Sequence, residues 1–348
     1  MIVVFLIVFL IRLLLAYLPS FTVDMGNWMA WSYLLGETGI KNFYNSPVWT
    51  DYTPGFFYYL RILGFLDKIY HFGSLSFPFL IKLPVIIADL LLGLVIYRIL
   101  KSKGIKSAKL GFLAYTLNPA VVFVDSVWGQ TDGLISFFLV LATFYFLEKK
   151  NAIYGFVSCA IALLVKPQAL AALPVLLVFS LKNFSLKKTT LAVLSAIVVV
   201  LLLSLPFFLE NPILGLPGLI AKMSNESPFT SVMAFNFWAV ATGMWIPDSI
   251  KFMGVTYHAW GIILLSLTTL IILFKLYFSK KAPDTLYKYL GLILLAFFIF
   301  PTRIHERYIL IALPFLLTSA LLSGSSFRFL VYALVSLLSF INIYNPYA

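Results

Sequence analysis

Asp24 is the first acidic residue of the chain and follows the first apolar segment by about six residues. A carboxylate at the outer surface of a membrane can take a proton from an acceptor hydroxyl, or it can bind a metal ion. It can equally cap a helix that begins near Gly26 or Asn27, because Asp is a favoured capping residue. The spacing alone leaves both roles open.

A second polar group follows Asn118-Pro119, a pair that breaks or kinks an apolar helix. Within eight residues the chain presents Asp125, Trp128, Gln130 and Asp132. Two carboxylates, an amide and an aromatic face are side chains that can bind the hydroxyls and the ring of a sugar. The simpler alternative is an interfacial Trp beside a capping Asp.

Basic residues begin two further apolar segments. Lys166 interrupts the apolar stretch 152–181 and directly precedes Pro167-Gln168. Because Pro suits the first turn of a helix, the ammonium of Lys166 would add to the positive end of a helix dipole, a favourable place for a phosphate. The alternative is an interfacial lysine whose ammonium extends to the aqueous phase.

The second basic group comprises Arg303, His305, Glu306 and Arg307. Two guanidinium groups at a helix start can bind a phosphate through paired hydrogen bonds. In the competing interpretation this is a basic interfacial cluster in which Glu306 pairs with an arginine.

The composition fixes the solvent in which these residues act. Of 348 residues, 62% are hydrophobic and only 11% are charged, and the mean hydropathy is +1.00. A soluble domain has roughly a quarter charged residues, so a cytosolic enzyme, a nucleic-acid binder and a disordered chain are excluded. The single cysteine, Cys159, excludes a disulfide framework and a cysteine-based metal cluster. The sequence therefore predicts an all-α, polytopic integral membrane protein in contact with membrane lipid.

About eleven apolar runs are candidates for transmembrane helices, at 2–18, 77–99, 108–124, 133–147, 152–165, 167–181, 190–209, 257–278, 286–301, 308–323 and 327–343. Two longer segments, 19–76 and 210–256, contain apolar stretches too short to span, which we expect to form amphipathic helices along the outer interface. The chain is expected to form a single integral domain.

The basic residues predict the orientation. Fifteen of them lie in loops on one side of the membrane, near 98–109, 149–150, 182–188, 275–288 and 328. The only acidic residues in these loops are Glu148 and Asp284. Short loops rich in Lys and Arg face the cytoplasm. We therefore expect a cytoplasmic N-terminus and an extracytoplasmic C-terminus, with Asp24 and the other polar groups on the extracytoplasmic side.

Arg12 and Asp89 are expected to lie deep in the bilayer. Counted at 1.5 Å per residue, both reach a similar depth in the first and second apolar segments. An unpaired charge at that depth would cost at least about 2.5–3.5 kcal/mol on insertion scales. We expect them to form a structural ion pair between two adjacent antiparallel helices.

At these positions the chain resembles the GT-C glycosyltransferases, membrane enzymes that use polyprenyl-phosphate sugars, and most of all the mannosyltransferases related to the second mannosyltransferase of GPI-anchor assembly. The similar residues are Asp24, Tyr52-Thr-Pro-Gly, Asn118-Pro, Trp128-Gly-Gln-Thr-Asp132, Lys166-Pro-Gln168 and His305-Glu-Arg-Tyr308. They follow in order along nearly the whole chain. Relatives often have Tyr-Pro-Pro where this chain has Tyr52-Thr-Pro. The resemblance implies a GT-C fold, with a GT-C-like module over 1–209 and a more variable part over 210–348. It also implies that Asp24 is the acidic residue of the first outer loop, a catalytic base or a metal-linked group.

Residues and resemblance together predict a hexosyltransferase, most simply a mannosyltransferase, with a polyprenyl- or dolichyl-phosphate sugar as donor and a lipid or glycan hydroxyl as acceptor. Asp24 would be the base. The donor phosphate would contact Lys166, Arg303, His305 and Arg307, and the sugar or acceptor would contact Tyr52, Asp125, Trp128, Gln130, Asp132, Gln168 and Glu306. No cofactor is expected: Asp24, Asp125 and Asp132 could share a divalent cation, but the basic residues already supply charge for the phosphate. The alternative is a transporter or flippase for a lipid-linked or anionic substrate.

Overall fold

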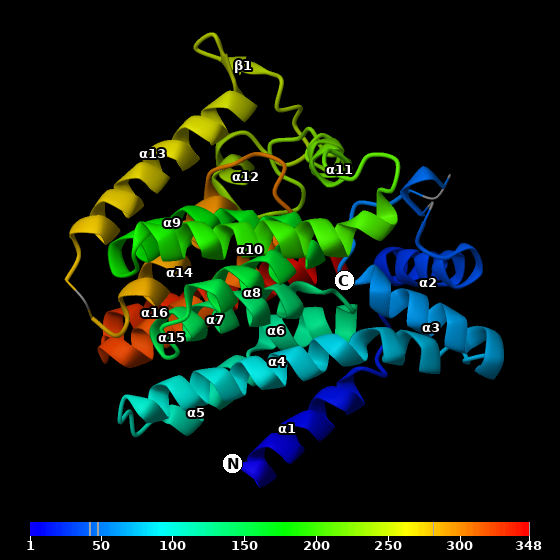
Figure 1. Cartoon of the computed structure of the whole chain (residues 1–348), viewed down its shortest axis with the longest axis horizontal. Coiled ribbons are helices and arrows are strands. Elements are labelled where there is room, and N and C mark those ends of the chain that lie inside the picture. The colour runs from blue at the N-terminus through cyan, green and yellow to red at the C-terminus, as the bar shows by residue number, and fades with distance from the viewer. Residues whose placement is uncertain (42, 47–48, 281, 348) are drawn as a thin grey trace.

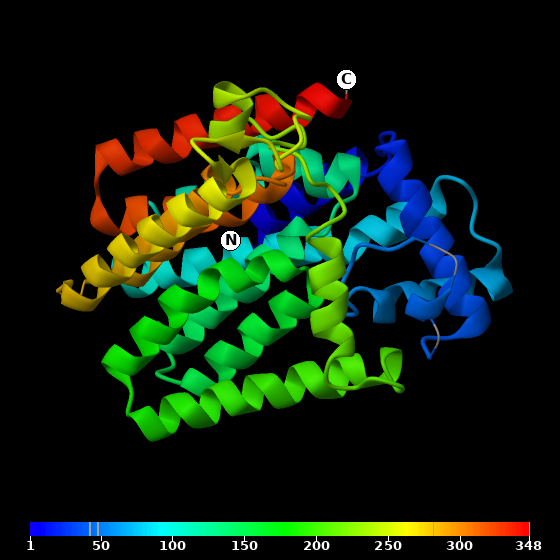
Figure 2. The ribbon, with the colours of Figure 1, turned by 90° about the horizontal axis from the view of Figure 1, so that it is seen from above.

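The computed structural model describes residues 1–41, 43–46, 49–280 and 282–347, and the chain is 74% helical. Most helices lie side by side in one bundle, as both ribbon views show (Figures 1 and 2). Each of the eleven apolar runs coincides with one helix or with two or three consecutive helical segments. The bundle helices are α1 (Ile2–Leu15), α4 (Ser76–Ser102), α5 (Ala108–Thr116), α6 (Pro119–Val122), α7 (Asp132–Leu147), α8 (Ala152–Val165), α9 (Leu173–Asn183), α10 (Leu186–Ser204), α13 (Tyr257–Phe278), α14 (Thr285–Ile299), α15 (Leu313–Ser323) and α16 (Ser326–Tyr347).

Five helices are long and apolar enough to cross a membrane, and the count is six if α5 and the segment Pro119–Trp128, which are bent by 44°, form one span. Five further apolar helices have only 10–17 residues. The expected count of about eleven transmembrane helices is therefore not confirmed. The apolar helices nevertheless agree with an integral membrane protein.

Short helical segments that are not regular α-helix interrupt the bundle. They are the π-helix η2 (Phe123–Trp128) and the 3₁₀ helices η3 (Pro167–Ala172), η4 (Leu205–Phe207) and η5 (Glu306–Ala312). Pro167 cannot continue α8 because it lacks a backbone N–H, so Lys166 adopts extended backbone angles before η3 begins. These breaks place buried polar side chains, among them Gln130, Lys166 and Arg307, between the helices.

The segment between α1 and α4 folds into α2 (Thr22–Thr38), the short helix η1 (Phe43–Asn45) and α3 (Phe57–Tyr70). This unit lies beside one end of the bundle, at the right of Figures 1 and 2. The two helices approach so closely that a Cβ at Gly64 would lie 1.9 Å from the backbone oxygen of Ser32. Glycine is therefore required there, and it holds α2 in place against α3.

The segment between α10 and α13 forms the second group of elements outside the bundle. It contains α11 (Gly215–Met223), α12 (Phe237–Ala241) and the strands β1 (Lys251–Phe252) and β2 (Val255–Thr256), which pair antiparallel. Both outer segments that the sequence indicated thus contain short helices.

A buried polar network anchors η2 between α1 and α4. The guanidinium of Arg12 donates hydrogen bonds to the carboxylate of Asp89, to the hydroxyl of Ser126 and to the backbone oxygen of Thr116. Arg12, Asp89 and Ser126 are all 0% exposed. Arg12 thus meets the partner that the sequence indicated, and this contact compensates much of the cost of burying either charge.

Asp125 belongs to the same network. One of its carboxylate oxygens accepts a hydrogen bond from the backbone N–H of Gly133 at 3.3 Å. Its other oxygen lies beside Gly133 together with an oxygen of Asp89. Asp125 is 1% exposed. The contacts of Asp125 in this structure are therefore those of a residue that anchors η2, and none of them involves Asp24.

Candidate active site

Asp24 lies in the first turn of α2, two residues after the helix begins, while Phe21 occupies the N-cap position. The capping role considered for Asp24 is therefore wrong. Its Oδ2 accepts a hydrogen bond from Trp128 Nε1 at 2.6 Å and another from the side-chain amide of Gln130. Both bonds reach the same oxygen, so no hydrogen bond from the described residues reaches Oδ1. A carboxylate held in this way keeps one oxygen for a substrate hydroxyl.

Gln130 connects Asp24 to a buried lysine. Gln130 follows Gly129, whose φ of 96° turns the chain sharply at the end of η2. Its Oε1 accepts hydrogen bonds from the hydroxyl of Tyr52 at 2.7 Å and from Lys166 Nζ at 3.0 Å. Three segments that are distant in the sequence therefore meet at one amide group.

Lys166 is 3% exposed. Its ammonium is therefore buried and does not extend to the aqueous phase, as the interfacial alternative would require. Its Nζ also donates to Asp132 Oδ2 at 3.0 Å and lies 5.0 Å from the ring centre of Tyr52. Burial lowers the pKa of Lys166, and the nearby Asp132 carboxylate opposes that change. The ion pair thus keeps a positive charge beside Gln130.

Arg307 supplies a second cation to this cluster. Its Nη1 donates to Glu306 Oε1 at 2.7 Å, and its guanidinium carbon lies 6.0 Å from the ring centre of Trp128. Within the described part of the chain, the buried Nε of Arg307 has no hydrogen-bond acceptor. A buried donor without a partner is costly, so this N–H is available to a ligand oxygen.

His305 and Arg303 lie at the edge of the cluster. Burial and the positive charges of Arg307 and Lys166 lower the pKa of His305 to about 3, so its imidazole is neutral at pH 7. Arg303 donates to both carboxylate oxygens of Asp248, at 2.7 and 3.3 Å, and to Asn225 Oδ1 at 2.8 Å. With the backbone oxygen of Ser224 at 2.8 Å, its guanidinium has four acceptor atoms, so it tethers the 210–256 segment.

Two cavities adjoin the cluster. The first has a volume of about 740 Å³ and is lined by side chains that include Asp51, Gln168, Arg303, His305 and Tyr308. The second is an apolar groove of about 680 Å³ between α8, α10 and α11. Leu170, Ile220 and Ser224 line both, so the groove is continuous with the polar cavity. A chain with an apolar tail and a polar head fits this combination.

Sequence reasoning missed Asp51, although it directly precedes Tyr52. Burial raises the pKa of Asp51 to about 6, and the positive charges of Arg307 and Lys166 only partly oppose that increase. Its Oδ1 is buried without a hydrogen-bond partner in the described residues, as is Oε1 of Gln168. Two features of the sequence could have identified Asp51. It is one of only 13 acidic residues in a hydrophobic chain, and it is next to Tyr52, which was already a candidate site residue.

Asp24, Asp125 and Asp132, the possible cation ligands, do not gather. Asp24 bonds to Trp128 and Gln130, Asp125 to Gly133, and Asp132 to Lys166. Over residues 1–41, 43–46, 49–280 and 282–347, no three His, Cys, Asp or Glu side chains are arranged to hold one ion.

Comparison with known proteins identifies the fold. No family model and no curated protein matches the sequence. Among solved structures, the crystal structure of ArnT from Cupriavidus metallidurans in the apo state is similar, with a TM-score of 0.64 and 16% sequence identity. The similarity covers 93% of this chain and 60% of the ArnT chain, so the chain spans about three fifths of that protein's length. The chain therefore shares the overall fold of this ArnT structure over most of its own length.

Proposed function

We propose that the protein is a membrane glycosyltransferase that moves a hexose, most simply mannose, from polyprenyl or dolichyl phosphate to a hydroxyl of a lipid or glycan. We further propose that the reaction takes place at the extracytoplasmic face, with the N-terminus in the cytoplasm and the C-terminus outside. Residues 1–209 would form the GT-C-like module, and 210–348 the more variable part, which contributes Arg307.

The observation that supports this proposal is the meeting of one carboxylate and two buried cations around Trp128 and Gln130. Asp24 comes from α2, Lys166 from the α8–η3 break and Arg307 from η5. A base for the acceptor and cations for a leaving phosphate are what glycosyl transfer from a phosphate requires.

In the proposed reaction, the free oxygen of Asp24 takes the proton of the acceptor hydroxyl. The hydroxyl oxygen then forms a bond to the anomeric carbon from the side opposite the phosphate, while the bond from that carbon to the phosphate oxygen breaks. The electron pair of the broken bond stays on the leaving polyprenyl phosphate, and the configuration at the anomeric carbon is inverted.

The leaving phosphate gains negative charge, which Arg307 and Lys166 would stabilise. The unpaired Nε of Arg307 is a donor that a phosphate oxygen would complete. Neutral His305 can donate one hydrogen bond but adds no charge at pH 7. Arg303 would orient the phosphate only if it gave up one of its present acceptors. We propose that this chemistry runs without a metal ion.

The apolar groove supports a lipid-linked donor. Its lining comes from α8, α10 and α11, and it reaches the polar cavity at Leu170, Ile220 and Ser224. A polyprenyl chain in the groove would bring its phosphate to the cavity, and Tyr52, Gln130, Asp132 and Gln168 would contact the sugar or the acceptor.

A transporter or flippase is the second candidate. The polar residues of a transport path should reach the midplane and both faces. Here the deep residues Arg12 and Asp89 pair with each other, and Asp125 accepts a hydrogen bond from the backbone of Gly133. This arrangement favours the transferase.

The test is transfer by purified protein in lipid nanodiscs, with radiolabelled polyprenyl-phosphate mannose and a pool of membrane lipids as acceptors. We expect a labelled glycolipid with wild type, and a loss of at least about 100-fold with Asp24→Asn, because general-base catalysis contributes about 10²–10⁴-fold. Glu37→Gln is the matched control, since Glu37 is an exposed carboxylate on the same helix.

Three results would contradict the proposal. Label that crosses a liposome membrane without a new glycosidic bond would favour the transporter. Transfer that Asp24→Asn leaves unchanged would remove Asp24 as the base, and transfer lost on addition of a chelator would contradict the metal-free reaction.

A further inference from the structure

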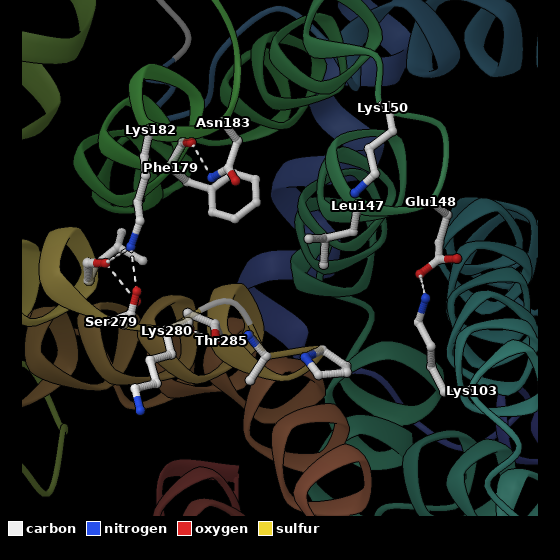
Figure 3. Close-up of a pocket in the computed structure, with 13 residues that line it drawn as sticks. Lys103, Leu147, Glu148, Lys150, Phe179, Lys182, Asn183, Ser279, Lys280 and Thr285 are labelled. Carbon is white, nitrogen blue, oxygen red and sulfur yellow. Dashed lines mark hydrogen bonds and ion pairs between the residues drawn. The ribbon is translucent and has the colours of Figure 1, made fainter.

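A separate pocket of about 280 Å³ lies at the opposite end of the bundle from Asp24. Figure 3 shows the side chains that line it, from the ends of α4, α7, α9 and α13 and from the α7–α8 and α13–α14 connections. Helix α7 runs from Asp132 at the candidate active site to Leu147 at this pocket, a length of about 24 Å for its 16 residues. The pocket is therefore remote from the proposed chemistry.

The pocket has an excess of positive charge. Four lysines line it, Lys103, Lys150, Lys182 and Lys280, against one carboxylate, Glu148. Lys103 Nζ lies 2.8 Å from Glu148 Oε1 and neutralises that carboxylate. Three lysines thus have no carboxylate partner among the residues that the structure describes.

Hydrogen bonds of Lys182 stabilise the wall of the pocket. Lys182 Nζ donates to the backbone oxygens of Leu276 at 3.0 Å and Ser279 at 2.6 Å, which ties α9 to the end of α13. Figure 3 shows Lys150 directed inward beside Leu147, while Lys280 extends outward from the rim. Lys150 is placed to contact a ligand directly, and Lys280 can reach one by a side-chain rotation.

An apolar surface adjoins the pocket on the same two helices. Val178 and Leu270, Leu273 and Phe274 form a shallow depression between α9 and α13. Leu270 is 63% exposed and Phe274 is 67% exposed, which suits contact with acyl chains. The direct chain neighbours Val178 and Phe179 line the depression and the pocket respectively.

We propose that this pocket binds the phosphate headgroup of an anionic phospholipid, whose acyl chains lie along the α9–α13 depression. Basic pockets at the ends of membrane helices bind anionic headgroups because the local dielectric strengthens the attraction between ammonium and phosphate. Free phosphate shares the headgroup chemistry, but it would leave the apolar depression unused. The lipid is therefore the occupant that matches both surfaces.

The experiment uses the full-length protein, delipidated in a neutral detergent, and native mass spectrometry to count bound lipids. The probes are phosphatidylglycerol, phosphatidylcholine and inorganic phosphate. Wild type should retain one phosphatidylglycerol molecule at concentrations where phosphatidylcholine does not bind. Two lysines near a membrane surface contribute a factor of about five each, so Lys150→Gln with Lys280→Gln should weaken retention about 30-fold.

Matched variants separate the pocket from general surface charge. Lys109→Gln removes an exposed lysine near the same end of the bundle but outside the pocket, and it should change nothing. Lys150→Arg with Lys280→Arg keeps both charges and should retain the lipid, which also shows that the positions tolerate substitution. Equal retention of both lipids would overturn the proposal. So would equal weakening by Lys109→Gln, or millimolar phosphate that binds as tightly as the lipid.

Discussion

Arg307 is the residue whose contacts point most directly to a ligand. Its guanidinium pairs with Glu306 through Nη1, while its buried Nε has no acceptor among the described residues. Arg303, only four positions away, donates hydrogen bonds to the side chains of Asp248 and Asn225. Two arginines in one short segment therefore face different partners, and substitution should separate them.

We predict that Arg307→Lys lowers kcat/KM for the lipid-linked donor by about 10- to 100-fold, because lysine keeps the charge but loses the forked donor geometry. Arg303→Lys should leave kcat/KM within about threefold and instead lower the Tm, since it breaks the tie to Asp248. Steady-state kinetics and thermal unfolding in the same nanodiscs check both outcomes. Equal kinetic losses in the two variants would argue against the assignment.

Asp51 gives a prediction about pH. Burial raises its pKa from 3.8 to about 6 in the folded protein. A carboxyl whose folded pKa is raised stabilises the fold below its unfolded pKa, and that contribution is lost as the pH rises through about 6. Ionised Asp51 thus costs up to about 3 kcal/mol at pH 7.5, reduced to about 1–2 kcal/mol because the residue is partly exposed.

We therefore expect Asp51→Asn to raise the Tm at pH 7.5 and to leave it nearly unchanged at about pH 2.5, well below the unfolded pKa, where Asp51 is protonated in both states. Thermal unfolding of both proteins at the two pH values is the measurement. A variant that is less stable at pH 7.5 would mean that Asp51 is ionised and paired in the native protein.

At the scale of elements, the position of α2 depends on its contact with α3. A Cβ at Gly64 would lie 1.9 Å from the backbone oxygen of Ser32, a distance that no packing can accommodate. Gly64→Ala should therefore separate α2 from α3 and displace Asp24, which lies on α2. We predict at least a tenfold loss of transfer activity and a lower Tm.

Gly26→Ala is the matched control for that prediction. Gly26 is two residues from Asp24 on the same helix, and a Cβ there meets nothing within 4 Å. This variant should retain activity and gain slightly in helix stability, since Ala has the higher helix propensity. Equal activity in Gly64→Ala and Gly26→Ala would show that the α2–α3 contact does not position Asp24.

The helical elements could be predicted from the sequence because apolar runs between charged segments have few other solutions in a membrane chain. The segments that contain Asp24, Gln130, Lys166 and Arg307 could be identified as candidate site segments, because polar residues are rare in a chain of this composition. The number of spanning helices could not be predicted from the sequence. Pro119 and Pro167 break apolar segments, and hydropathy alone does not tell whether the helices on the two sides of a break form one span, two spans or none.

Only some of the contacts between distant elements could be predicted from the sequence. Arg12 and Asp89 could be paired because both lie at the same depth and each would be costly alone. Asp125 lies seven positions before Asp132, yet it bonds to Gly133 and lies near Asp89, whereas Asp132 bonds to Lys166. Which carboxylate faces the site depends on the π-helix η2, and no local pattern in 123–128 indicates that turn.

At the scale of the whole molecule, the apolar groove offers a test of how the donor is held. Ala196 on α10 lines the groove and is partly buried. Ala196→Trp should fill part of the 680 Å³ volume and raise the KM for a long-chain polyprenyl-phosphate sugar about tenfold or more, because each buried CH₂ contributes about 0.8 kcal/mol. A donor with a two-isoprene chain, too short to use the full groove, should lose little.

Val198→Trp provides the control, since Val198 lies on the same helix, is 50% exposed and is not part of the groove lining. It should affect neither donor, because its side chain faces the surrounding lipid. The comparison isolates chain length: a groove that holds the prenyl chain makes Ala196→Trp selective against long donors. Equal losses for long and short donors would instead indicate a distorted α8–α10 contact, and the groove would no longer support a lipid-linked donor.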